Sequence, residues 1–177
     1  MIVNGDFSNG TTGFTPYVYD SYAVDGQTIT LAKYWVDSLE EPDAMKYEIY
    51  NTGDQDWHIQ LKQENVTLEK GQWYKISFKI KSTLPRTVKY AMQHDGSSDN
   101  VWTVYDGKNI SLTNEYKNFT KTFQMTEDTD SKTNFTISMG AVTGQLAVKH
   151  QICIDDIVLE ETTAPEEGET TEAGTYS

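Results

Sequence analysis

The sequence predicts an all-β protein, a sandwich of two antiparallel sheets. Apolar and polar residues alternate with a period of two along most of residues 1–161, as in strands that bury one face. Clusters of Gly, Asn, Asp and Ser interrupt this alternation at short intervals, as turns between strands do. No segment of about ten or more residues has the apolar spacing of an amphipathic helix.

Three segments show the alternation most clearly. Residues 75–81 have an apolar residue at every second position, and residues 134–139 repeat the pattern. Residues 87–93 do the same, with Lys89 and Gln93 among the outward side chains. Because successive strand residues point to opposite faces, one face of each strand joins the core while the other is available to line a groove.

The last predicted strand, residues 151–159, contains an irregularity. Its apolar phase slips by one residue at Asp155 and Asp156, which is the effect of a β-bulge. Turns are expected at residues 69–71, 95–98 and 106–107.

The chain has the length of one ordinary domain, and we expect that domain to cover residues 1–161. Residues 162–177 are rich in Thr and Glu and have almost no apolar surface, which predicts a disordered Thr/Glu/Pro linker or tail. Such a linker would tether the domain to another part of a longer protein. A plain frayed tail is the alternative.

The net charge limits the class of partner. The chain has 14 Lys and Arg against 27 Asp and Glu, a net charge of -13 at pH 7. An acidic surface repels the phosphates of nucleic acids and anionic lipid headgroups, so we expect neither nucleic acid nor a membrane as partner. Cys153 is the single cysteine and cannot form an intramolecular disulfide. A signal peptide is absent from the start, so secretion would require its earlier removal.

The sequence lacks the patterns of common enzyme classes. The histidines His58, His94 and His150 are far apart and have no zinc-site spacing. GxSxG, Walker A and GxGxxG motifs are missing. The acidic pairs at residues 40–41 and 155–156 are adjacent, and adjacent strand residues point to opposite faces, so neither pair can flank one glycosidic bond. We therefore expect a protein that is not an enzyme.

Aromatic residues are abundant, at 12% of the chain, although the hydrophobic fraction is only 37%. One face of a pyranose ring consists of C–H groups that pack on an aromatic plane, and its hydroxyls need donors and acceptors. Candidate stacking platforms are Trp57, Trp102, Tyr17, Tyr19 and Tyr22. Candidate hydrogen-bonding residues are Gln60, Gln63, Lys89, Gln93 and Asn134.

The local patterns of the tryptophans differ. Trp57 has the same parity as Ile59 and Leu61, so a regular strand would bury it. Trp102 follows the polar residues 97–100, a position that favours an exposed ring. The other two, Trp35 and Trp73, fit core or edge packing.

Four segments carry a family resemblance: residues 3–8 (VNGDFS), 56–63 (DWHIQLKQ), 68–78 (LEKGQWYKISF) and 154–159 (IDDIVL). In this order they resemble carbohydrate-binding modules of family 4 and its relatives in families 9, 16 and 22. The resemblance implies a jelly-roll β-sandwich whose concave sheet forms a cleft for single glycan chains. It also implies that a linker joins the module to a secreted glycoside hydrolase.

The resemblance implies roles for individual residues. Trp57 and Trp102 match the sugar-stacking positions, and Trp57 would lie at the start of its strand, where twist turns it toward the cleft. Further residues that fall on cleft strands are Gln60, Lys89, Gln93, Asn134 and Ser138. Tyr19 and Gln63, chosen from the aromatic and amide pattern, complete the predicted glycan site.

The resemblance also implies a structural calcium ion between the N-terminal segment and the last strand, away from the cleft. Calcium takes about six to eight oxygen ligands from carboxylates and backbone carbonyls. The matching positions are Asp6, Ser8, Glu41, Asp43 and Asp155. Ser8 departs from the family pattern, in which an acidic residue is common there. Surface acids in an acidic protein are the alternative.

We therefore expect a secreted, monomeric, non-catalytic module that holds single β-glucan chains and targets a linked glycoside hydrolase. Cello-oligosaccharide, amorphous cellulose and mixed-linkage β-glucan are the leading ligands. Xylan, xyloglucan and β-1,3-glucan remain alternatives for the same fold. A structural or adhesive sandwich without a sugar ligand is the alternative of a different class.

Overall fold

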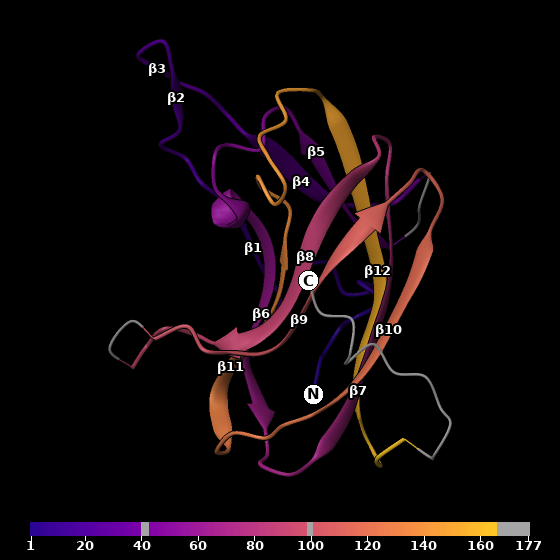
Figure 1. Ribbon diagram of the computed structural model, residues 1–177. Helices are drawn as coiled ribbons and strands as arrows, with labels where there is room; N and C mark the ends of the chain where they lie inside the picture. Colours follow the sequence, from indigo (N-terminus) through magenta and orange to yellow (C-terminus); the bar gives the residue numbers. More distant parts are fainter. Residues whose placement is uncertain (40–42, 99–100, 166–177) are drawn as a thin grey trace.

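A computed structural model describes residues 1–39, 43–98 and 101–165 and confirms the all-β prediction (Figure 1). The first sheet has the order β1 (Thr15–Val18), β6 (Ile59–Leu68), β11 (Asp130–Ser138), β8 (Arg86–His94) and β9 (Val104–Leu112). The second sheet has the order β10 (Lys117–Gln124), β7 (Trp73–Ser82), β12 (His150–Thr162), β5 (Ala44–Ile49) and β4 (Ala32–Asp37). Neighbouring strands in both sheets are antiparallel.

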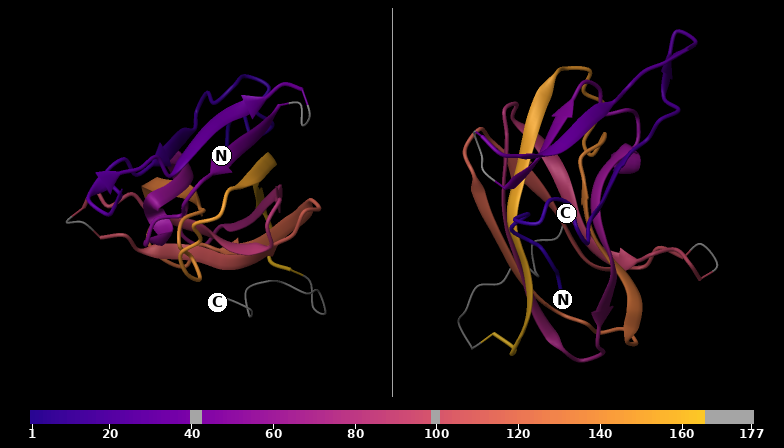
Figure 2. Two further views of the ribbon diagram at one scale, coloured as in Figure 1. Left: turned by 90° about the horizontal axis from the view of Figure 1, so that it is seen from above. Right: turned by 180° about the vertical axis from the view of Figure 1, so that it is seen from behind.

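A small hairpin and a long loop project from one side of the sandwich. The hairpin consists of β2 (Ala23–Val24) and β3 (Gln27–Thr28), and the loop connects β8 to β9. Figure 2 shows the hairpin and the described residues of the loop, 95–98 and 101–103, from two further directions, and in each view they extend beyond the body formed by the two sheets. The short 3₁₀ helix η1 (Asp56–His58) lies on the same side (Figure 1).

The core lies between the two sheets, where aromatic rings from both meet. Phe78 of β7 is 6.1 Å from Tyr90 of β8 and 6.0 Å from Phe135 of β11, measured between ring centroids. Phe119 of β10 lies 4.9 Å from Phe78 and 5.5 Å from Tyr90. All four rings are buried. Burying such a side chain stabilises the fold by about 1.5–3 kcal/mol, so these contacts hold the sheets together.

The predicted strands are confirmed in type and phase. Residues 75–81 and 87–93 lie within β7 and β8, residues 134–138 lie within β11, which ends one residue before the predicted strand, and burial alternates along the whole of β7. The predicted bulge in the last strand is also present, because the pairing of β12 with β7 shifts register between Asp155 and Val158.

One predicted turn is wrong. Residues 69–71 and 95–98 lie between strands as expected, but residues 106–107 lie inside β9. Asp106 points into the core, where its carboxylate accepts a hydrogen bond from the Tyr90 hydroxyl (2.9 Å) and pairs with the Lys121 ammonium. The aspartate is therefore a buried ion-pair residue, and its frequent use in turns misled the assignment.

The last strand extends slightly beyond the predicted domain boundary. β12 ends at Thr162, which pairs with Trp73 of β7. The predicted linker falls mostly on residues 166–177, which lie outside the described residues, and it stays a prediction. In the described part of the chain, no helix has the length and apolarity needed to span a membrane.

Candidate functional site

A groove of about 490 Å³ lies on the face of the first sheet that points away from the core. It is lined by Tyr17, Asp56, Trp57, Gln60, Lys62, Lys89, Ala91, Gln93, Trp102 and Ser138. Six of the nine residues predicted for the glycan site are in this set: Trp57, Gln60, Lys89, Gln93, Trp102 and Ser138. The side chains come from four strands of the sheet, β1, β6, β11 and β8, from η1 and from the β8–β9 loop.

Strand register explains why residues distant in sequence meet in the groove. Gln60 of β6 pairs with Tyr17 of β1 on one side and with Ser138 of β11 on the other. Ser138 in turn pairs with Lys89 of β8. Directly paired residues of antiparallel strands share a face, so these four side chains form one row across the sheet. Within the row, the Gln60 amide donates to the Ser138 hydroxyl at 3.2 Å.

The groove face of β11 carries two more polar residues, Thr136 and Asn134, at alternate positions before Ser138. They pair with the groove residues Ala91 and Gln93 of β8 and are 2% and 3% exposed. Among the described residues, Thr136 Oγ1 and Asn134 Oδ1 find no hydrogen-bond partner. A buried polar atom left without a partner costs about 1–3 kcal/mol. Neither Thr136 nor Asn134 is among the residues that line the groove, so both lie beneath its surface.

Trp57 lies in η1, directly before β6, and is 41% exposed. Strand alternation does not apply in a 3₁₀ turn, which is why the parity with Ile59 did not bury the ring. Behind it, the buried His58 ring stacks on Tyr19 at 4.4 Å with an interplanar angle of 4°. The Trp57 ring packs edge-on against both, 4.5 Å from His58 and 5.3 Å from Tyr19. Tyr19 therefore supports the groove wall and is not among the lining residues.

Backbone hydrogen bonds anchor η1 to the end of β11. The Gly140 and Ala141 amides donate to the carbonyls of Asp56 and Gln55, each at 3.0 Å. The carbonyl of Gly140 accepts a hydrogen bond from Arg86 Nη2 at 2.7 Å. The segment that carries Trp57 is thus tied through Gly140 to a buried arginine on β8.

This arginine has a neutral partner. Arg86 Nη1 lies 3.0 Å from His150 Nε2, and His150 Nδ1 lies 2.7 Å from the carbonyl of Val148. Because a carbonyl only accepts, Nδ1 carries the hydrogen and Nε2 accepts from the guanidinium. Burial lowers the pKa of His150, with a further contribution from the Arg86 charge, and burial lowers the pKa of Arg86 to about 10.

Two lysines face the groove. The Lys89 ammonium lies 3.7 Å from an Asp56 carboxylate oxygen, and both side chains are about 40% exposed. The Lys62 ammonium lies 5.4 Å from the centroid of the Tyr17 ring, within cation–π range. These contacts hold donors at the groove surface, where sugar hydroxyls accept hydrogen bonds.

The structure does not place Gln63 in the groove. It pairs with Phe135, a core residue of β11, and its side chain is held by the N-terminal segment. Gln63 Oε1 accepts from the Val3 amide at 2.8 Å, while Nε2 donates to the Val3 carbonyl at 2.9 Å. Gln63 lies two residues after the core residue Leu61, so strand alternation alone indicated that its side chain points toward the core. Tyr22 also does not line the groove; its hydroxyl accepts from Gln145 Nε2.

Sequence reasoning missed two lining residues and one floor residue. Lys62 lies two residues after Gln60 in β6, and Thr136 lies two residues after Asn134 in β11. Strand alternation therefore indicated that each shares a face with the predicted residue. Asp56 lies in η1, whose conformation no sequence pattern indicated.

The predicted calcium site is brought together only in part. The Ile157 amide donates to the Gly5 carbonyl at 2.9 Å, which places the N-terminal segment against β12. Burial, together with the charges of Asp156 and Asp6, raises the pKa of Asp155 to about 6. Asp6 and Asp155 are thus within electrostatic range of each other.

Of the other predicted ligands, the structure describes Ser8 and Asp43. The Ser8 amide donates to Asp6 Oδ1, and Asp43 lies next to the start of β5. Glu41 falls outside the described residues. In the described part of the chain, no group of three or more His, Cys, Asp and Glu side chains has the arrangement of a metal site. Calcium therefore stays a prediction.

Calcium binding is expected to raise the melting temperature, because a ligand that binds only the folded state stabilises it. At calcium concentrations about 100 times the Kd, the gain in the free energy of unfolding is about 2.7 kcal/mol. Scanning calorimetry with excess calcium and with a chelator measures the difference. Asp155→Asn should abolish it, whereas Asp128→Asn, on an exposed side chain, should not. Equal melting temperatures in calcium and chelator would contradict the site.

Comparisons with known proteins identify the family and the fold. A family model described as "Carbohydrate binding domain" (CBM_4_9) matches residues 1–145. A structure described as "CBM4 structure and function" has 23% identity and a TM-score of 0.73, covering 92% of this chain and 100% of its own. No curated protein matches the chain.

Two further solved structures have the same fold. The N-terminal cellulose-binding domain of β-1,4-glucanase C from Cellulomonas fimi has 17% identity and a TM-score of 0.60, covering 86% of this chain and 91% of its own. The CBM22-1 xylan-binding domain of Xyn10C from Paenibacillus barcinonensis has 13% identity and a TM-score of 0.59, covering 91% and 94%. With the family match over residues 1–145, the fold and the groove lead to one conclusion: the chain belongs to the CBM_4_9 family of carbohydrate-binding domains.

Proposed function

We propose that the groove binds a single chain of β-linked glucan, such as a cello-oligosaccharide, without catalysing its cleavage. One observation carries the proposal: two half-exposed indoles, Trp57 and Trp102, lie in the same groove as a floor of amide and hydroxyl groups. The indoles offer planes for the C–H faces of sugar rings. The floor offers both donors and acceptors to the hydroxyl groups.

The polar groups that line the groove support a ligand rich in hydroxyl groups. Gln60, Gln93, Lys89 and Ser138 all lie in the lining, together with the two indoles. The amides and the serine hydroxyl both donate and accept, and the ammonium donates, so together they can pair with several sugar hydroxyls. A purely apolar ligand would desolvate these groups without replacing their hydrogen bonds, at a cost that a sugar avoids.

Two solved structures of the same fold are described by ligands that this groove could also accept. The Cellulomonas fimi domain is described as cellulose-binding, and the Paenibacillus barcinonensis domain as xylan-binding. Stacking on an indole does not depend on the C6 hydroxymethyl group that distinguishes glucose from xylose, so xylan is the second candidate. We further propose that the module serves a linked glycoside hydrolase outside the cell, through the predicted Thr/Glu-rich linker, which would begin after the end of β12 at Thr162.

Affinity electrophoresis against a panel of polysaccharides tests the proposal. We expect retardation by hydroxyethyl cellulose and lichenan, weaker retardation by xylan, laminarin and xyloglucan, and no release of reducing ends from any of them. Stronger retardation by xylan would replace the glucan assignment with the second candidate. Unchanged migration with every polymer, together with unchanged tryptophan fluorescence, would favour a structural or adhesive sandwich.

A further inference from the structure

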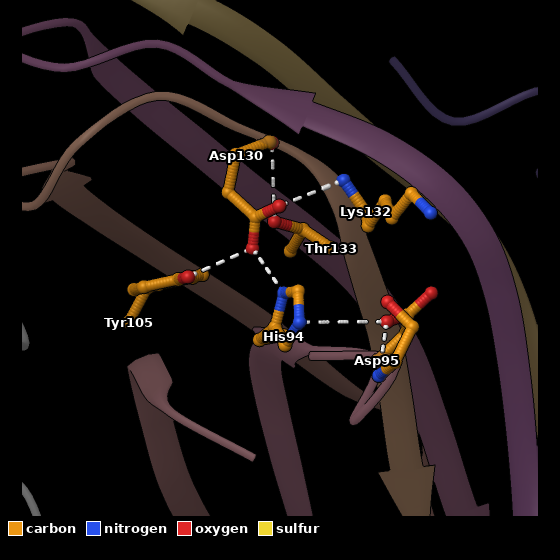
Figure 3. Close-up of polar contacts among 7 residues, drawn as sticks. His94, Asp95, Tyr105, Asp130, Lys132 and Thr133 are labelled. Carbon is orange, nitrogen blue, oxygen red and sulfur yellow. Dashed lines mark hydrogen bonds and ion pairs between the residues drawn. The ribbon is translucent and has the colours of Figure 1, made fainter. Parts of the chain in front are cut away.

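The β8–β9 loop, which carries Trp102, is tied at both ends to one carboxylate. His94 ends β8 before the loop, and Tyr105 lies at the start of β9 after it. His94 Nδ1 lies 2.8 Å from Asp130 Oδ2, and the Tyr105 hydroxyl donates to the same oxygen at 2.7 Å. Figure 3 shows Asp130, the first residue of β11, between these two side chains.

Asp130 is itself held in place and kept ionised. Its Oδ1 accepts from the Lys132 amide at 2.8 Å. Burial pulls the pKa of Asp130 upward, but the hydrogen bonds from Lys132, Tyr105 and His94 outweigh this effect and hold the pKa below 3.8. Burial and the bond to Asp130 raise the pKa of Tyr105 to about 12, so its hydroxyl remains a donor at neutral pH. Hydrogen bonds to a charged acceptor are stronger than those between neutral groups.

Backbone contacts close the same end of the loop. The His94 amide donates to the Thr103 carbonyl, and the Asp95 amide donates to the Lys132 carbonyl, both at 2.9 Å. The Asp95 carboxylate accepts from the Ser97 amide. The residues just before and just after the loop are therefore joined to each other and to β11.

Inside the loop, the indole of Trp102 packs directly on Gly96. A Cβ atom at Gly96 would lie 2.3 Å from Trp102 Cζ2, closer than any real contact, so no other residue leaves room for the ring in this position. Gly96 also has φ +79°, a conformation that glycine adopts without strain. The glycine thus forms the seat of the indole, while Trp102 remains 52% exposed toward the groove.

We propose that Asp130 is a positioning residue for glycan binding: by holding His94 and Tyr105 it keeps Trp102 seated on Gly96 before a ligand arrives. This inference rests on the proposed function, because it takes Trp102 as a stacking platform. When the platform is already ordered, binding does not have to include the entropic cost of ordering a loop and a side chain. If its support is weakened, that cost is subtracted from the binding free energy.

Two substitutions remove the support without touching the groove lining. Tyr105→Phe deletes one hydrogen bond to Asp130, and Asp130→Ala deletes those from Tyr105 and His94 together with the one from the Lys132 amide. We expect the Kd for a cello-oligosaccharide to rise about 2- to 10-fold, the equivalent of one side chain ordered on binding. The matched control is Tyr74→Phe, which also removes one hydroxyl hydrogen bond, to the Glu69 amide at the β6–β7 turn. It should lower the melting temperature without changing the Kd.

A spectroscopic readout separates positioning from general destabilisation. The chain has four tryptophans, and loss of one indole N–H signal in Trp102→Phe assigns the Trp102 peak in a ¹H–¹⁵N spectrum. In Asp130→Ala this peak should shift or broaden while the other three stay in place, at a temperature where the variant is fully folded.

A matched pair of glycine substitutions tests the contact between the Trp102 indole and Gly96. Gly96→Ala introduces the clash with the indole, whereas Gly26→Ala, at the same φ of +79°, meets nothing within 4 Å. Both substitutions place an alanine at the same positive φ, and only Gly96→Ala adds a clash with the indole, so only Gly96→Ala should weaken binding and move the Trp102 peak.

The outcomes distinguish the inference from the proposed function. If Trp102→Ala weakens binding while Tyr105→Phe, Asp130→Ala and Gly96→Ala keep the wild-type Kd and Trp102 peak, the positioning role is overturned and the glycan site stands. If Trp102→Ala binds as the wild type does, Trp102 is not a platform, and both the proposal for this residue and the inference built on it fail.

Discussion

Replacing Trp57 or Trp102 by alanine is expected to weaken binding of a cello-oligosaccharide by about 2 kcal/mol, or about 30-fold in Kd. Both rings line the groove and remain 41% and 52% exposed, so each offers a plane to a sugar ring. Removing an indole takes away both the stacking area and the wall that excludes water from the neighbouring hydrogen bonds. Isothermal titration calorimetry measures the change directly.

Trp35 supplies the control for this experiment. It is 37% exposed, close to the value for Trp57, but it lies on β4, the edge strand of the second sheet. Trp35→Ala should leave the Kd unchanged, because an exposed ring outside the groove contributes nothing to the site. Equal losses in Trp35→Ala and Trp57→Ala would show that the groove is not the binding face.

Asp106→Ala is expected to lower the free energy of unfolding by about 3–5 kcal/mol. Asp106 of β9 and Lys121 of β10 form an ion pair in which both side chains are 0% exposed, and the Tyr90 hydroxyl donates to the same carboxylate. β9 and β10 are edge strands of opposite sheets, so the pair joins the two layers. Without Asp106, the buried Lys121 ammonium loses the carboxylate with which it pairs. Urea unfolding measures the loss.

An exposed ion pair gives the matching control. Lys70 and Asp128 lie 3.4 Å apart with side chains 64% and 96% exposed, and Asp128→Ala should cost less than about 1 kcal/mol. The double variant Asp106→Leu with Lys121→Met should recover much of the stability, because it removes both charges from the core and replaces them with apolar groups. A small loss in Asp106→Ala would mean that water or another group compensates the lysine.

The sequence predicted the fold correctly where a strand has one face in the core and one in water. β7 is the clearest case, because its buried residues alternate from end to end. The bulge of β12 was visible as a slip of the apolar phase at Asp155 and Asp156. The predicted turn at Asp106 was wrong, because this residue, of a type common in turns, forms an ion pair in the core.

The candidate site was predictable to a similar degree and for the same reason. Lys89, Gln93 and Ser138 occupy outward strand positions, and alternation places such residues on a single face. Gln63 was misplaced because its amide suggested a sugar contact, although its parity assigned it to the core side. The exposure of Trp57 was not predictable from alternation, because the residue lies in a 3₁₀ turn that follows a different periodicity.

The sequence by itself determined the strands, their inward and outward faces and the family to which they are similar, because these depend on residues close together in the chain. Only the tertiary structure decided which outward faces meet in one groove. That outcome depends on the pairing of β6, β11 and β8, and on Asp130 reaching across from β11 to the strands on either side of the Trp102 loop. Contacts between distant residues follow from the packing of the two sheets as a whole, and no local pattern of residue types encodes them.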